Sequence, residues 1–233
     1  MNRFWEIDAT RGIAVVLMVF FNYSFTLDYL RIYTITEVWG FWWLFPRLVA
    51  GAFILLAGIS VTISYSRDSR IRKHLMRGIK IFGLGLLITA ATYLLIPSAT
   101  VWFGILHLIG TAIIISLLFM KWNPKLLITA GIFAIILGAL LESTAFGFPW
   151  LLWLGLMPYS FTTLDYFPLL PWLGVFMIGM AIGKLYYREG KRQFKIKELR
   201  TGTIGFLGRH SLIIYLLHLP VLLVVLKILG LLL

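Results

Sequence analysis

The sequence predicts an all-α protein, a polytopic bundle of transmembrane helices. Of its 233 residues, 61% are hydrophobic and 13% are charged, whereas soluble domains have roughly 45–50% apolar and about 25% charged residues. The mean hydropathy of +0.94 is equally high. Several apolar stretches also reach the length of about 20 residues that a helix needs to cross a bilayer. A soluble globular domain and a disordered chain are therefore excluded.

Seven stretches have this length and take up most of the chain, so we expect one transmembrane domain over residues 1–233. The first is predicted to be a span and not a signal peptide, because it continues into NYSFTLDYL without a small-residue cleavage site. The small-xxx-small pair Gly179 and Gly183 indicates close helix packing and is compatible with a homodimer. The expected spans are residues 12–30, 39–64, 77–96, 102–120, 125–143, 167–186 and 203–230.

The basic residues orient the bundle. With a cytoplasmic amino terminus, all of the 21 Lys and Arg residues lie on the cytoplasmic side except Arg31, Arg47 and Lys227. We therefore expect a multi-pass protein of the cell membrane with its carboxyl terminus outside. An eighth span at 147–163 would move the basic loop 184–200 outside, so 147–163 is interpreted as an interfacial or re-entrant segment. The net charge of +12 thus reflects topology in the lipid bilayer, and we expect no nucleic-acid partner.

Polar residues lie at membrane depth in the first two spans. At about 100° per residue, Asp8, Arg11 and Asn22 share one face of the first helix. Such residues are functional candidates by default, but an interfacial ion pair and an interhelical hydrogen bond would explain them equally well. In the second span, Arg47 could hold a carboxylate, phosphate or oxyanion, or it could extend to the outer headgroups.

Two histidines and one carboxylate are further candidates. His107 lies near the outer end of the fourth span, and His218 shares a stripe of the last helix with Ser211 and Tyr215. Either histidine could relay a proton, act as a general base or hydrogen-bond a neighbouring helix. Asp165 is expected at the entrance of the sixth span, where the helix dipole favours an anion, as a functional group or as a cap.

Other chemistries have little support in the sequence. It contains no cysteine, no histidine cluster with metal-ligand spacing, no P-loop and no G-x-S-x-G motif, so no metal is expected. The basic residues of two cytoplasmic segments, 67–80 and 184–200, could contact anionic lipids or bind the phosphates of a nucleotide-like donor. The candidates from the first of these segments are Arg72, Lys73, Arg77 and Lys80.

Five blocks, in order along nearly the whole chain, carry a family resemblance. They are RFWEIDATRGIAVVLMVFFNYSF, WWLFPRLVAGAFILLAGIS, WFGILHLIG, LDYFPLLPWLGVFMIGMAIG and LGRHSLIIYLLHLP. Together they resemble the heparan-alpha-glucosaminide N-acetyltransferase-like membrane proteins, especially their small prokaryotic branch. The family's D-x-x-R-G signature falls on Asp8, Arg11 and Gly12, and its first-helix asparagine falls on Asn22. Its catalytic histidine follows that asparagine by eleven residues, a place that Tyr33 occupies here.

The resemblance implies a membrane acyltransferase that takes an acetyl group from cytoplasmic acetyl-CoA to an amine or hydroxyl of an extracytoplasmic sugar or glycolipid. We expect His218 or His107 to be the base. Asn22 and Arg47 would hold the thioester carbonyl, and Asp165 would orient the acceptor. The expected ligands of the CoA phosphates are Arg11, Arg72, Lys73, Arg77 and Lys80. The alternatives are a transporter or flippase-like protein for a small anion or lipid headgroup, and a non-catalytic membrane module of the same family.

Overall fold

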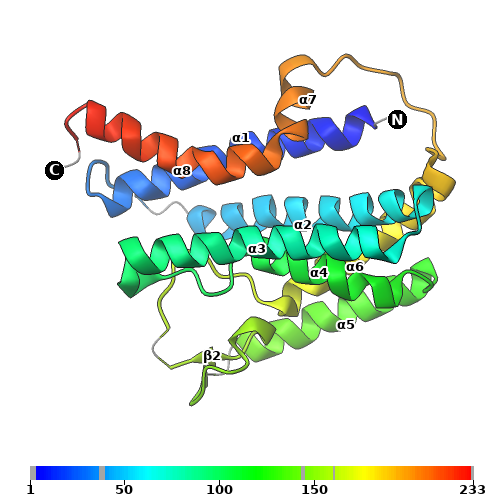
Figure 1. Cartoon of the computed structure of the whole chain (residues 1–233), viewed down its shortest axis with the longest axis horizontal. Coiled ribbons are helices and arrows are strands. Elements are labelled where there is room, and N and C mark those ends of the chain that lie inside the picture. Colours follow the sequence, from blue (N-terminus) through cyan, green and yellow to red (C-terminus); the bar gives the residue numbers. More distant parts are fainter. Residues whose placement is uncertain (1–3, 37–39, 143–144, 160, 232–233) are drawn as a thin grey trace. The chain divides into compact units, whose positions relative to one another are not determined.

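The computed structural model describes residues 4–36, 40–142, 145–159 and 161–231, and these are predominantly helical (Figure 1). The all-α prediction is confirmed, and a parallel pair of two-residue strands, β1 and β2, is the sheet structure among the described residues. The helices are α1 (Trp5–Tyr29), α2 (Phe41–Arg67), α3 (Ile71–Leu95), α4 (Ile105–Phe119), α5 (Pro124–Glu142), α6 (Leu169–Tyr186), α7 (Gly202–Arg209) and α8 (Ser211–Ile228).

Six of these helices are long and apolar enough to cross a membrane, namely α1, α2, α3, α5, α6 and α8. The stretch 102–120 is helical only over the 15 residues of α4, which rise about 22 Å, less than the roughly 30 Å of a hydrocarbon core. The stretch 203–230 is divided into α7 and α8, because the helix breaks at His210. Seven crossings and the orientation of the bundle stay predictions.

The chain forms two compact units, and their boundary falls inside α2. The terminal unit comprises Met1–Phe53 and Ile196–Leu233. In it, α1 packs against both α7 and α8 (Figure 1). The backbones of α1 and α7 meet without intervening side chains: a Cβ on Gly12 would collide with the carbonyl of Ile204, and one on Gly208 with the carbonyl of Asp8.

The central unit, Ile54–Lys195, pairs α3 with α4 and α5 with α6, and α4 also contacts α6. Glycines bring α6 against α2 in the same way, because Gly179 faces the carbonyl of Leu55 and Gly183 faces Thr62. The close packing predicted from these two glycines is therefore confirmed.

The segment 147–163 contains no membrane-length helix among its described residues. Strand β1 (Ala145–Phe146) pairs with β2 (Met157–Pro158), and a single 3-10 turn, Leu152–Leu154, lies between them. Trp150 is 79% exposed, as expected for an aromatic residue at a membrane interface. Its placement as an interfacial or re-entrant segment stays a prediction.

The extended backbone before α4 is held by the segment that precedes α6. Leu164 N donates to Ala99 O at 3.1 Å, and Phe167 N donates to Phe103 O at 2.9 Å. This pairing satisfies backbone groups that no helix serves, and it fixes the start of α4 beside residues 163–167.

Candidate functional site

In the terminal unit, Asp8 and Arg11 form an ion pair beside the crossing of α1 and α7. Arg11 Nη1 lies 3.8 Å from Asp8 Oδ1, and Asp8 is buried. Gly12 and Gly208 let α7 approach this pair closely. The D-x-x-R-G pattern thus builds a helix contact, in which the glycine permits the approach and the charged residues lie next to it.

His218 is a buried histidine of the terminal unit with one ring nitrogen left without a hydrogen-bond partner in the described part of the chain. It is 7% exposed, its Nδ1 lies 2.6 Å from Tyr215 O, and its ring stacks on that of Tyr23. Tyr23 Oη donates to His218 O at 3.0 Å, which ties α1 to α8 at this point. The Nε2 atom has no hydrogen-bond partner among the described residues.

These contacts define the tautomer of His218. A carbonyl oxygen only accepts, so Nδ1 must carry the proton that it donates to Tyr215 O. In the neutral ring the lone pair is then on Nε2. An unpartnered acceptor nitrogen in a buried place is costly unless something else binds it, and it has the form that a general base requires.

The other candidates of the terminal unit lie at different points. Asn22 precedes Tyr23 on α1, and its Nδ2 donates to Met18 O at 2.9 Å. Arg11 is about 16 Å from Asn22 along the helix axis, so these two side chains do not form one cluster. Arg47 turns back along α2, with Nη1 2.8 Å from Trp43 O and its guanidinium 4.1 Å from the centre of the Trp43 ring. Tyr33 is 64% exposed.

His107 and Asp165, of the central unit, meet at the start of α4. His107 Nδ1 accepts a hydrogen bond from Gly104 N at 3.2 Å, and the backbone N–H of Ile105 donates to Asp165 Oδ2 at 3.1 Å. Both therefore satisfy N–H groups that the first turn of a helix leaves without partners. The predicted capping carboxylate is present, but it caps α4 and not α6.

The tautomer of His107 is opposite to that of His218. Because Nδ1 accepts from Gly104, Nε2 carries the proton, and it lies 3.3 Å from Thr89 Oγ1, whose own hydroxyl donates to Val101 O. The ring is 2% exposed and packs between Phe82 and Phe103. Both nitrogens are thus engaged in the structure, which favours a structural role.

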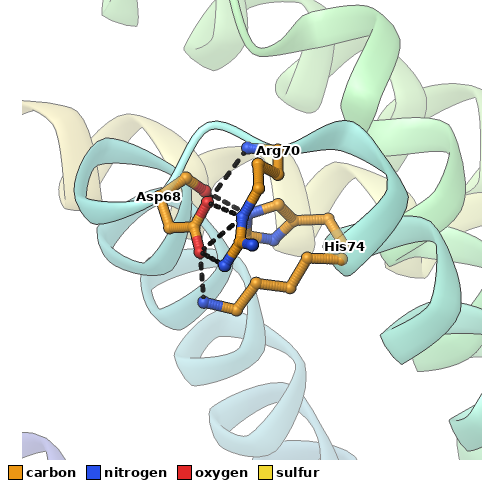
Figure 2. Close-up of polar contacts among 4 residues, drawn as sticks. Asp68, Arg70 and His74 are labelled. Atoms are coloured by element: carbon orange, nitrogen blue, oxygen red, sulfur yellow. Dashed lines mark hydrogen bonds and ion pairs between the residues drawn. The ribbon is translucent and has the colours of Figure 1, made fainter.

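An ion-pair cluster around Asp68 lies at the turn between α2 and α3 (Figure 2). Asp68 Oδ2 is 2.7 Å from Arg70 Nη2 and 2.9 Å from Lys73 Nζ, and these two cations hold the pKa of Asp68 well below its usual range. His74 Nε2 lies 2.8 Å from Asp68 O. Lys73 is therefore already paired, whereas Arg72, Arg77 and Lys80 are exposed along the helix.

Two adjoining cavities lie in the central unit, where α4, α5 and α6 reach the predicted cytoplasmic side. The larger encloses about 510 Å³ and is lined by Lys121, Trp122, Asn123, Pro124, Lys184, Leu185 and Arg188. The smaller, of about 280 Å³, shares Lys184 and Arg188 with it. The sequence placed Lys184 and Arg188 in a basic segment that could bind phosphates, but it gave no indication that they share a cavity with Lys121. Tyr23 was also missed, because its link to His218 bridges 195 residues.

Within the described ranges no three His, Cys, Asp or Glu residues are close enough to hold a metal ion. A family model described as heparan-alpha-glucosaminide N-acetyltransferase, catalytic, matches residues 3–220. This range contains every candidate residue named above. No curated protein and no solved structure matches the chain significantly.

Proposed function

Because the chain belongs to the heparan-alpha-glucosaminide N-acetyltransferase family of membrane acyltransferases, we propose that it acetylates an extracytoplasmic acceptor with acetyl-CoA from the cytoplasm. The acceptor would be an amine or hydroxyl of a sugar or glycolipid. The helices of membrane-spanning length indicate a membrane protein, and the cell membrane is its proposed location.

The observation that carries this proposal is the unpartnered Nε2 of His218. In acetyl transfer the acceptor nitrogen or oxygen attacks the thioester carbonyl carbon, a new C–N or C–O bond forms, and the C–S bond breaks to release the CoA thiolate. A general base removes the proton of the attacking group. Nε2 can take that proton because the Nδ1–H bond to Tyr215 O fixes the ring in the required tautomer.

The remaining candidates are given subordinate roles. Asn22 and Arg47 would donate hydrogen bonds to the carbonyl oxygen as negative charge develops on it, and Asp165 would orient the acceptor. His107 is assigned to folding and not to proton transfer, because both of its nitrogens are occupied. The CoA phosphates would be held by basic residues of the cytoplasmic side, and Arg11, Arg72, Lys73, Arg77 and Lys80 are the candidates from the sequence.

The proposal is tested with purified protein in liposomes, with radiolabelled acetyl-CoA on the cytoplasmic side and a panel of amino sugars and glycolipids on the other. Transfer by the wild-type protein is expected to fall at least about 100-fold in His218→Gln, the loss typical of a missing general base. His210→Gln is the matched control, because His210 lies at the break between α7 and α8 and its Nδ1 contacts the carbonyl of Phe206.

Full activity of His218→Gln would remove His218 from the mechanism. Binding of acetyl-CoA without transfer to any acceptor would identify a non-catalytic module, and passage of an anion or lipid without acetylation would identify a transporter. Either result would end the acyltransferase proposal.

A further inference from the structure

The larger cavity of the central unit combines features that fit a phosphate-bearing ligand. Its volume of about 510 Å³ is within the usual range of small-molecule sites, roughly 300–1,000 Å³. None of its seven lining residues is acidic, and three of them, Lys121, Lys184 and Arg188, are cationic. Glu189 lines only the smaller cavity.

Lys184 gives this cavity a fixed charge. Its Nζ donates to Met120 O at 2.6 Å and to Trp122 O at 2.7 Å, the carbonyls that follow α4. An ammonium group has three donors, so one remains after these two bonds. Lys121 and Arg188 have exposed side chains at the same cavity, and an Arg guanidinium can hold phosphate oxygens by two parallel bonds.

Two uncharged features of the cavity wall also favour a nucleotide ligand. Helix α5 begins at Pro124, in the cavity wall, and the amino-terminal end of a helix dipole favours an anion. Trp122 contributes an aromatic surface, on which a nucleotide base can stack.

The basic residues of α3 are less suited to the same task. Lys73 is already bound to Asp68. Arg72 and Lys80 are spaced about 12 Å along one helix axis, and neither lines one of the two described cavities.

We propose that the cavity of Lys121, Lys184 and Arg188 is a phosphate-binding site, and that its ligand is the phosphorylated nucleotide of CoA or the headgroup of an anionic phospholipid. Phosphate recognition itself follows from the cavity, whereas the CoA assignment rests on the proposed function. On that assignment, the phosphates of the donor bind at α4, α5 and α6 and not along α3.

The test compares three double variants, each of which loses two positive charges. Lys121→Gln/Arg188→Gln removes the exposed cations of the cavity, and Arg72→Gln/Lys80→Gln removes two of α3. Lys195→Gln/Lys197→Gln is the control in an exposed loop. Lys184 is left unchanged because its loss would also free two carbonyls of the α4–α5 turn. All side chains altered are exposed, so the variants are expected to fold.

Adenosine 3′,5′-bisphosphate, the nucleotide portion of CoA, is titrated calorimetrically into protein in nanodiscs of phosphatidylcholine. Retention of phosphatidylglycerol is measured separately by native mass spectrometry. We expect the cavity variant to bind one of these probes about tenfold more weakly than wild type, the scale of two partly solvated charge-assisted contacts. The control should bind as wild type does.

The probe that is affected identifies the ligand. Weaker bisphosphate binding with unchanged lipid retention assigns the cavity to CoA, and the reverse assigns it to a lipid headgroup. The inference is overturned if wild type binds neither probe, or if only the α3 variant weakens binding. Bisphosphate binding through the cavity in a protein that never transfers acetyl groups would refute the proposed function and leave the phosphate site standing.

Discussion

Replacement of His107 by alanine is expected to destabilise the protein substantially. The change removes the acceptor for Gly104 N and the donor to Thr89 Oγ1, and it leaves a void between Phe82 and Phe103. Hydrogen bonds in membrane proteins average about 0.6 kcal/mol, and a buried unsatisfied N–H or a lost aromatic contact costs about 1 kcal/mol or more. Together these give about 2–4 kcal/mol.

The assay is thermal unfolding in detergent, followed by circular dichroism. For a chain of this length 1 kcal/mol shifts Tm by about 2–4 °C, so a loss near the middle of the range lowers Tm by about 6–12 °C. His107→Gln is the matched variant: a glutamine at this third helical position can still accept from the N-cap N–H, and it should recover part of the loss. A Tm of His107→Ala equal to that of wild type would refute the assignment of His107 to folding.

Two further predictions concern Gly208 and Asp68. Gly208→Ala places a methyl group against the carbonyl of Asp8, and overpacking of this kind costs about 1–3 kcal/mol; it should lower Tm, whereas Gly83→Ala, with open space at its Cβ, should not. Because the pKa of Asp68 is lowered in the folded protein, its ion pairs stabilise the fold above the unfolded-state pKa of about 3.9 and lose this effect as the pH falls below it. The Tm difference between wild type and Asp68→Asn should therefore be larger at pH 7 than at pH 3, and a difference independent of pH would contradict this reasoning.

Hydropathy predicted the helices well because a bilayer requires long apolar segments whose backbone is satisfied internally. It located the six helices of membrane-spanning length among the described residues, whereas the charge pattern argued against a span at 147–163. Hydropathy placed a helix at 102–120, but the helix begins only at Ile105. The sequence is apolar on both sides of this point, so composition gave no signal for the extended residues 101–104. The break at His210 was also missed, although three consecutive polar residues, Arg209, His210 and Ser211, lie at this point.

The candidate site was predictable as a set of residues but not as an arrangement. The reasoning from ionisable groups in spans identified His107 and His218 with equal weight. The two histidines differ in which ring nitrogen carries the proton. That depends on whether a nitrogen faces a backbone N–H or a backbone carbonyl, and a sequence pattern does not specify these partners. The sequence placed Arg188 in a basic segment that could bind phosphates, whereas Lys121 looked like an ordinary residue of a short cytoplasmic loop. No sequence pattern indicated that the two residues line one cavity.

The hydrogen bond from Ile105 N to Asp165 also has a consequence for biogenesis. Asp165 follows Ile105 by 60 residues, which a ribosome adds in about 3–12 s at roughly 5–20 residues per second. Until then the first turn of α4 lacks its carboxylate partner, and the extended residues before it lack the strand-like neighbour at 163–167. The nascent chain therefore passes several seconds in which the start of the fourth helix lacks the partners that it has in the folded protein.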